Sequence, residues 1–269
     1  MKFIKVFLGV AVVSSLLMAD GYIISTGSKK GNYFKYGLRL SKFVPGSKVI
    51  TSKGSVENLQ RLVDNKAQIA IAQKDAFRWF ATKHSEAESI DLLGDLNKEC
   101  VFVVAKDEGK ISDDGDLQKD GVKVAVGKIG SGTQVTWDYM GSLEPGFKKA
   151  TAIPKGGSRA LGKVVSGEYD AAMFVLTPAK NNWLFNVVNK NKDLKFVPVT
   201  DWDLNDKLNG KPVYTFEKIT TKPGLFGDSV KTICTTASVF INGEVDDDVA
   251  DSISDALLTR KNYILKGGN

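Results

Sequence analysis

The chain is poor in the residues from which metal centres and hydrolytic triads are built. It has one histidine, His84, and two cysteines, Cys100 and Cys234, in 269 residues. These three side chains cannot supply the usual four ligands of a structural zinc site. A Ser-His-Asp mechanism would have to use His84, which lies in a polar stretch typical of the solvated surface. The sequence therefore predicts no metal, no cofactor and no enzymatic activity.

The two cysteines leave two interpretations open. An exported chain can oxidise them to a disulfide. Cys100 and Cys234 also lie in apolar, strand-like runs, where a buried free thiol behaves as a small hydrophobic side chain.

The chain also lacks a block of positive charge. Its 37 Lys and Arg exceed its 31 Asp and Glu only slightly, and the two signs are interleaved. No surface combining basic and aromatic residues is indicated, which argues against nucleic acid as a partner. The small positive excess is compatible with an anionic solute.

A secretory signal peptide is predicted at residues 1–19. Lys2 and Lys5 precede the apolar run 6–17, and cleavage is expected after Ala19. The run is short for a membrane span, although a retained N-terminal anchor is the alternative. We therefore expect a periplasmic protein. The remaining residues, 20–269, are enough for one large domain or for two lobes with separate cores.

Short apolar runs alternate with amphipathic helical patterns along the chain. This alternation predicts an α/β fold in which mostly parallel sheets are flanked by helices. Strands are expected at 22–24, 48–51, 69–72, 100–105, 122–126, 150–153, 171–175, 194–199 and 237–241. Helices are expected at 32–43, 55–65, 76–82, 132–140, 158–166 and 246–258, with one more starting near Pro178.

The alternation is interrupted once, and this suggests two lobes. A polar, Asp-rich stretch begins at residue 106 and ends at residue 121, after which the pattern restarts. We expect residues 20–105 to form the first part of lobe 1. Residues 106–199 would form lobe 2, and residues 200–269 would return to lobe 1.

Three Gly/Ser/Thr loops, at residues 25–33, 54–58 and 130–133, follow a predicted strand and precede a predicted helix. The first turn of a helix exposes unpaired N–H groups and a partial positive charge, which suit an anion. In open α/β sheets, ligands bind beyond the carboxyl ends of the strands. The loops therefore predict a cleft for a small, negatively charged solute.

The order and spacing of these loops resemble a known family, the TAXI-type solute-binding proteins of TRAP transporters. The matching segments are Thr26-Gly27-Ser28, Gly31-Asn32-Tyr33, Gly54-Ser55-Val56-Glu57-Asn58-Leu59, Ala72-Gln73-Lys74-Asp75-Ala76, Val124-Ala125-Val126-Gly127 and Gly130-Ser131-Gly132-Thr133. The resemblance implies a two-lobed type II periplasmic-binding-protein fold with the ligand cleft between the lobes. It also implies delivery of an organic acid or amino acid to a TRAP-type membrane permease. Such a lobe pair is expected to act as a monomer. The chain departs from the family pattern at Ser28, Lys29 and Lys30, where further glycines are usual.

The candidate ligand contacts come from these loops and from the strand ends beside them. Each has a structural alternative: Ser55 and Ser131 as helix caps, Tyr33 as a core residue, and Gln73 and Asp75 as caps of the next helix. The full set is Thr26, Gly27, Ser28, Asn32, Tyr33, Ser55, Asn58, Gln73, Asp75, Ser131, Gly132, Thr133, Ser158 and Phe174, with Lys29, Lys30, Arg159 and Thr177 as further candidates.

Other functions compete with the transport receptor. Lys29 and Lys30 would also suit a phosphate- or phosphonate-type oxyanion-binding protein of an ABC permease. A third possibility is a periplasmic ligand-sensing partner of a signalling receptor. Enzymatic motifs are incomplete: the loop ending at Thr133 lacks the lysine of a P-loop, and the nucleophile-elbow-like run 156–160 ends in Ala160.

Overall fold

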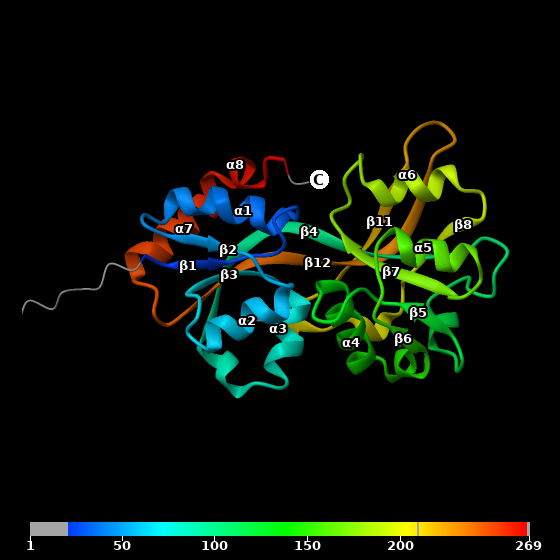
Figure 1. Cartoon of the computed structure of the whole chain (residues 1–269), viewed down its shortest axis with the longest axis horizontal. Helices are drawn as coiled ribbons and strands as arrows, with labels where there is room; N and C mark the ends of the chain where they lie inside the picture. Colours follow the sequence, from blue (N-terminus) through cyan, green and yellow to red (C-terminus); the bar gives the residue numbers. More distant parts are fainter. Residues whose placement is uncertain (1–20, 209, 268–269) are drawn as a thin grey trace, which may run out of the picture.

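A mixed, ten-stranded sheet forms the centre of the molecule in the computed structural model, which describes residues 21–208 and 210–267 (Figure 1). Its strands are β1 (Ile23–Ser25), β2 (Lys48–Ile50), β3 (Ile69–Gln73), β4 (Ile90–Lys106), β5 (Lys123–Ala125), β6 (Thr151–Ile153), β7 (Ala171–Leu176), β8 (Leu194–Val197), β11 (Thr215–Lys222) and β12 (Asp228–Asn242). Two short strands, β9 (Lys207–Leu208) and β10 (Lys211–Pro212), pair separately. The helices are α1 (Asn32–Leu40), α2 (Ser55–Val63), α3 (Lys74–Ala81), α4 (Gly132–Leu143), α5 (Ser158–Val165), α6 (Trp183–Lys190), α7 (Asp247–Thr259) and α8 (Lys261–Leu265).

The sheet is parallel at its two ends and antiparallel in its middle. Its strand order is β2-β1-β3-β12-β4-β7-β5-β6, with β11 paired to β12 and β8 paired to β4. The pairs β1–β2, β1–β3, β5–β6 and β5–β7 are parallel, as the alternating sequence pattern predicts. The long strands β4 and β12 pair with each other in antiparallel fashion and connect the two ends of the molecule (Figure 1).

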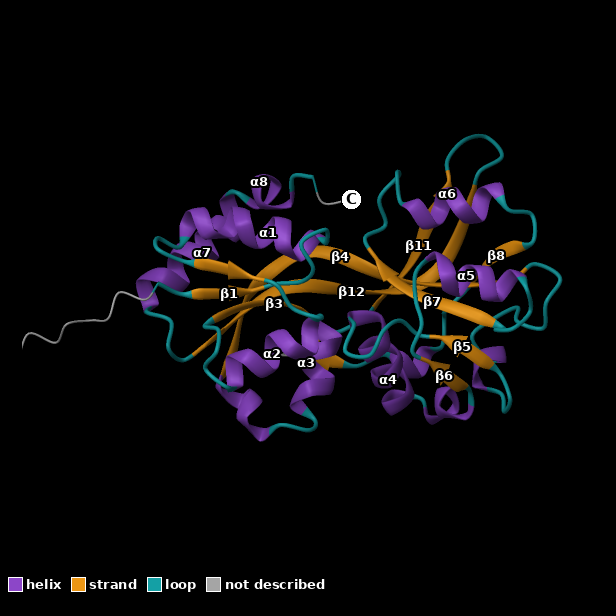
Figure 2. Ribbon diagram, in the orientation of Figure 1, coloured by secondary structure: helices purple, strands orange, loops and turns teal. Residues whose placement is uncertain are grey.

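Helices cover both faces of the sheet (Figure 2), so strands such as β3 and β7 are apolar on both sides. In β3, Ile69 and Ile71 pack in the core under α1, α7 and α8, whereas Ala70 and Ala72 face α2 and α3. Successive strand residues point to opposite faces, and β4 alternates in the same way. Its residues 101, 103 and 105 share a core with α4, and residues 100, 102 and 104 pack with α5 and α6.

The structure corrects several predicted elements. The strand expected at 100–105 is the second half of the 17-residue β4, and the strand expected at 237–241 is the second half of β12. The expected helix start near Pro178 is wrong, because α6 begins at Trp183 after its N-cap residue Asn182. The whole of β11 is missing from the sequence prediction, since half of its residues are exposed and give no apolar run.

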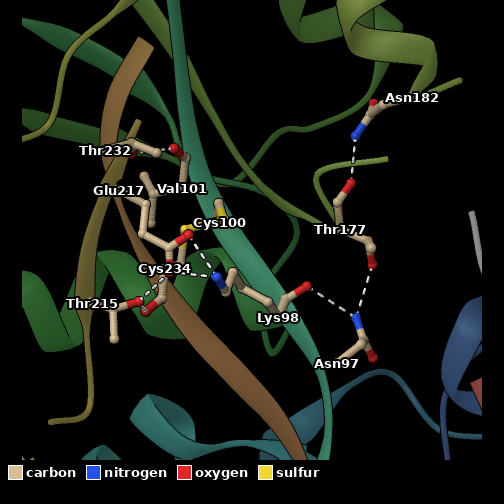
Figure 3. Close-up of a disulfide and its surroundings, with 10 residues drawn as sticks. All are labelled: Asn97, Lys98, Cys100, Val101, Thr177, Asn182, Thr215, Glu217, Thr232 and Cys234. Atoms are coloured by element: carbon tan, nitrogen blue, oxygen red, sulfur yellow. Dashed lines mark hydrogen bonds and ion pairs between the residues drawn. A yellow bond between two sulfur atoms is a disulfide. The ribbon is translucent and has the colours of Figure 1, made fainter. Parts of the chain in front are cut away.

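A disulfide joins the two long central strands (Figure 3). Cys100 of β4 lies directly opposite Cys234 of β12 in the antiparallel ladder, and their sulfur atoms are bonded. Both residues are buried. Of the two interpretations of the cysteines, the disulfide is the correct one.

The predicted signal peptide lies outside the described residues. Within residues 21–208 and 210–267, no helix has the length and the apolar character that crossing a membrane requires.

Candidate functional site

A cavity of about 590 Å³ lies where the two ends of the molecule face each other. One wall comes from the loops before α1 and α2 and from the end of β3. The other comes from the start of α4, the end of β7 and the loop before α6. The lining residues are Gly27, Ser28, Lys30, Gly31, Asn32, Tyr33, Ser52, Lys53, Gly54, Ser55, Gln73, Glu99, Gly132, Thr133, Val175, Leu176, Thr177, Asn181, Asn182 and Trp183.

The N-termini of helices α1 and α2 lie at this cavity. The N-cap residues of α1 and α2 are Gly31 and Gly54, and no side chain caps either helix. The following residues, Asn32 and Ser55, also line the cavity. The positive ends of two helix dipoles therefore face the same space, where a carboxylate would be stabilised.

Gln73 carries an unpaired buried donor at this wall. It is the last residue of β3, it is 2% exposed, and its backbone N–H donates to Ser55 Oγ at 3.2 Å. Its side-chain Nε2 has no hydrogen-bond partner in the described part of the chain. Because a buried donor without a partner is costly, Nε2 is suited to a ligand oxygen.

Glu99 brings a carboxylate into the same cavity. Its Oε2 accepts a hydrogen bond of 2.9 Å from the Tyr33 hydroxyl. Burial, with a smaller contribution from nearby Asp75, raises the pKa of Glu99 to about 8. A buried carboxylate of this kind is the natural partner of a ligand ammonium or guanidinium group. The site is therefore bipolar once Glu99 is ionised: positive dipole ends and a carboxylate then line one space.

The wall from the other end of the molecule has an apolar part beside the polar residues Thr133, Thr177, Asn181 and Asn182. Val175, Leu176 and Trp183 line it, and Trp183 is held edge-on by the ring of Phe174, with centroids 5.7 Å apart. Thr133 Oγ1 accepts from the backbone N–H of Val175 at 3.2 Å, which ties the start of α4 to the end of β7. This wall suits the carbon skeleton of a small solute.

The structure brings eight of the fourteen predicted contacts to the cavity and leaves six outside it. The eight are Gly27, Ser28, Asn32, Tyr33, Ser55, Gln73, Gly132 and Thr133. The six are Thr26, Asn58, Asp75, Ser131, Ser158 and Phe174. Of the further candidates, Lys30 and Thr177 line the cavity and Lys29 does not.

Three of the six residues outside the cavity, Thr26, Asn58 and Asp75, are buried and stabilise the fold. Thr26 Oγ1 donates to the carbonyl of Ile50 at 2.7 Å. The Asn58 side chain donates to the carbonyls of Thr26 and Ile71 and accepts from Ser25 Oγ, so it fastens α2 to β1 and β3.

The third buried residue is Asp75, which lies between α3 and α4. Its Oδ2 accepts from Thr136 Oγ1 at 2.6 Å and from the Tyr214 hydroxyl at 2.9 Å. Asp75 is fully buried, and burial raises its pKa.

The other three residues outside the cavity, Ser131, Ser158 and Phe174, line a neighbouring groove of about 880 Å³ together with Arg159. Ser131 Oγ accepts from the Gln134 backbone N–H at 3.3 Å, so it is the helix cap that the sequence offered as the alternative. Ser158 lies at the start of α5. The ring of Phe174 makes an edge-on contact with the ring of Trp183.

Sequence reasoning missed Glu99 and Trp183, and also the lining residues Ser52, Lys53, Val175, Leu176, Asn181 and Asn182. Glu99 immediately precedes the apolar run 100–105, and the only available signal was a carboxylate entering a buried strand. Trp183 follows Asn182, a recognisable N-cap residue.

Among the described residues, no group of three or more His, Cys, Asp or Glu side chains is placed to hold a metal ion.

Solved structures share this fold at low sequence identity. Holo ArgBP from T. maritima is 13% identical with a TM-score of 0.52, covering 89% of this chain and 90% of that chain. AbpA, an amino acid ABC transporter substrate-binding protein from Streptococcus pneumoniae bound to L-arginine, is 14% identical with a TM-score of 0.54, covering 93% and 92%. XAC2383 from Xanthomonas citri bound to ATP is 10% identical with a TM-score of 0.56, covering 92% and 87%. These likenesses confirm the predicted two-lobed α/β fold.

A search of curated proteins gave no match. The model of the NMT1-like family, in contrast, matches residues 24–266. Because this match includes nearly every element of the sheet and both walls of the cavity, the protein belongs to the NMT1-like family.

Proposed function

We propose that the protein is an extracytoplasmic receptor that binds a small amino acid in this cavity and presents it to a membrane permease. The observation that carries the proposal is the pairing of buried Glu99 with two uncapped helix N-termini in one cavity. An α-amino acid has the matching pair of charges. Glu99 would hold its ammonium group, and the first turns of α1 and α2, with Gln73 Nε2, would hold its carboxylate.

The bipolar site favours an amino acid over the other solutes considered. A phosphate or a dicarboxylate carries no cation to pair with ionised Glu99, so it would bind beside the protonated form, and its affinity should fall as the pH rises through the pKa of Glu99. The oxyanion receptor of an ABC permease is the alternative, and it predicts the opposite pH dependence from an amino acid receptor. Enzymatic activity is not part of the proposal, and the receptor is proposed to act as a periplasmic monomer.

The permease is proposed to be of the TRAP type. The support is the set of loop motifs shared with TAXI-type proteins, of which Gly31-Asn32-Tyr33, Gly54-Ser55 and Gly132-Thr133 supply cavity residues. The ABC transporter origin of AbpA favours the other kind of permease. Reconstitution with each type of permease in vesicles would separate the two.

We further propose the two lobes that the sequence suggested, residues 20–105 with 200–269 and residues 106–199, but with the boundaries moved into the long strands. Residues 100–105 of β4 and Val230, Ile233 and Cys234 of β12 pack in the cores of α4, α5 and α6 and belong with the second lobe. Strands β4 and β12 would then be the connections about which the lobes close. Their pairing is irregular between Thr236 and Ser238, which is a suitable place for bending. Ligand that binds the closed state more tightly would shift the population toward it.

A ligand screen tests the proposed function. Thermal-shift measurements with the twenty amino acids, dicarboxylates and phosphate should give a rise of several degrees in melting temperature for at least one amino acid. The N-acetyl derivative of that amino acid, which has no ammonium group, is the matched control and should give no rise. Stabilisation by phosphate or a dicarboxylate alone would contradict the proposal.

Replacing Gly132 with alanine should weaken binding of the amino acid found in this screen by at least about tenfold, or about 1.4 kcal/mol. A Cβ at position 132 would lie 1.8 Å from Gln73 Oε1, so the amide must leave its place in the cavity wall. Titration calorimetry measures the loss. Gly162→Ala is the control, because a Cβ at that position of α5 meets nothing within 4 Å. Equal affinities for Gly132→Ala and the unsubstituted protein would exclude this wall from the site.

A further inference from the structure

The hairpin formed by β11 and β12 carries an apolar tip that packs on nothing. Leu225 is 94% exposed and Phe226 is 87% exposed. The two residues are adjacent, and they lie in the turn between Lys222 and Asp228. Figure 1 shows this hairpin projecting beyond α6. No residue of the hairpin tip lines the candidate ligand cavity.

The turn is built so that both side chains point outward. The backbone N–H of Gly227 donates to the carbonyl of Gly224 at 3.1 Å. Gly224 has a φ of 120°, and a Cβ at Gly227 would lie 2.4 Å from the Lys222 carbonyl oxygen. The turn therefore requires glycine at both positions. Because the backbone is this tight, the large side chains between the glycines have no room on the inside.

Positive charge surrounds the base of the tip. Lys192, Lys195 and Lys222 line a groove there together with one carboxylate, Asp228. In the part of the chain that the structure describes, neither Lys192 nor Lys222 forms an ion pair. The tip is thus apolar at its end and cationic at its base.

We propose that this tip, Pro223–Gly227, docks the protein on a bilayer that carries anionic phospholipids. Protruding aromatic and aliphatic side chains enter the boundary between headgroups and acyl chains, and lysines near them interact with lipid phosphates. A specific protein partner needs about 800 Å² of contact on each side, and two side chains on a narrow turn offer much less. The combination of a convex apolar end and a basic base fits a lipid surface.

The placement of the tip connects docking to the ligand cavity. Asn189 Nδ2 of α6 donates to the Thr221 carbonyl of β11 at 2.8 Å, which fixes the hairpin against α6. The same helix begins at Trp183, a residue of the cavity wall. Docking would therefore hold one wall of the cavity near the membrane, where a permease lies.

Vesicle binding tests the proposal. The protein should cosediment with vesicles of phosphatidylglycerol and phosphatidylcholine, and much less with phosphatidylcholine alone. Leu225→Ser with Phe226→Ser should lower the partition coefficient by at least about tenfold. Leu258→Ser is the matched control, because Leu258 is 85% exposed on α7. Every variant keeps the same N-terminus, so any contribution of the N-terminal segment cancels in the comparison.

Two further measurements separate insertion of the tip from electrostatic attraction alone. Lys192→Gln with Lys222→Gln should reduce the preference for anionic vesicles and its dependence on salt. Phe226→Trp should add fluorescence that brominated lipids quench. Equal vesicle binding before and after the Leu225 and Phe226 substitutions would overturn the proposal. So would a dimer, seen by analytical ultracentrifugation without lipid, that these substitutions dissociate, because the tip would then bind a second copy.

Discussion

Glu99→Gln is expected to weaken binding of an ammonium-bearing ligand by about 100-fold at pH 8.5, because the ligand cation loses its buried partner. The substitution keeps the shape of the side chain and an acceptor for the Tyr33 hydroxyl but removes the charge. Glu244→Gln is the control, since Glu244 is exposed. Titration calorimetry with the amino acid found by thermal shift measures both variants. An unchanged affinity for Glu99→Gln would show that this carboxylate does not contact the ligand.

The same residue should give binding a steep pH dependence. With a pKa of about 8 before the ligand binds, Glu99 is mostly protonated at pH 6 and must lose a proton before it can pair with a cation. The affinity should therefore rise about tenfold per pH unit from pH 6 to 7.5 and level off above pH 8. Binding at pH 7 should release a proton, which appears as a buffer-dependent enthalpy. Both effects should be absent from Glu99→Gln, and a flat profile in the unsubstituted protein would contradict the assignment.

Loss of the Cys100–Cys234 disulfide should lower the free energy of unfolding by about 3–5 kcal/mol. The bond spans a sequence separation of 134 residues, and closing a loop of that size removes much of the conformational entropy of the unfolded chain. Cys100→Ala with Cys234→Ala is the suitable variant, because alanine leaves no unpaired hydroxyl in this buried position. Urea unfolding gives the difference.

Two controls make this result specific. The unsubstituted protein under reducing conditions should match the double alanine variant to within the cost of removing two sulfur atoms. Single variants should resemble the double variant, since either one breaks the bond. Equal urea midpoints for the oxidised protein and the double variant would mean that the pairing of β4 with β12 needs no covalent support.

The sequence was most informative where a strand ends at a glycine-containing loop. The parallel pairs β1–β3 and β5–β7 are visible as apolar runs because helices bury both faces of these strands. The loops before α1, α2 and α4 were recognisable because helix starts require particular residue types. These local rules, together with the resemblance to TAXI-type proteins, predicted eight of the residues that line the cavity.

The errors come from contacts between distant segments. Asp75 was predicted as a ligand contact, yet it is bonded to Thr136 and Tyr214, and nothing near residue 75 in the sequence indicates these partners. Glu99 was missed because residues 90–99 of β4 are partly exposed and show no clean alternation. A polar residue at a strand end can face solvent, a ligand or another helix, and only the packing of the far segments decides which.

The place of β12 also bears on how the chain would fold during the export that the proposed function requires. This strand lies between β3 and β4 in the sheet, although β3 and β4 follow each other in sequence and β12 comes from residues 228–242. Contacts between such distant segments form slowly because loop closure must precede them. A chain that emerges with its N-terminus first cannot complete the centre of its sheet until residue 242 is available. Late synthesis of the central strand thus keeps the earlier segments from locking into the final sheet, a property that suits a polypeptide crossing a membrane unfolded.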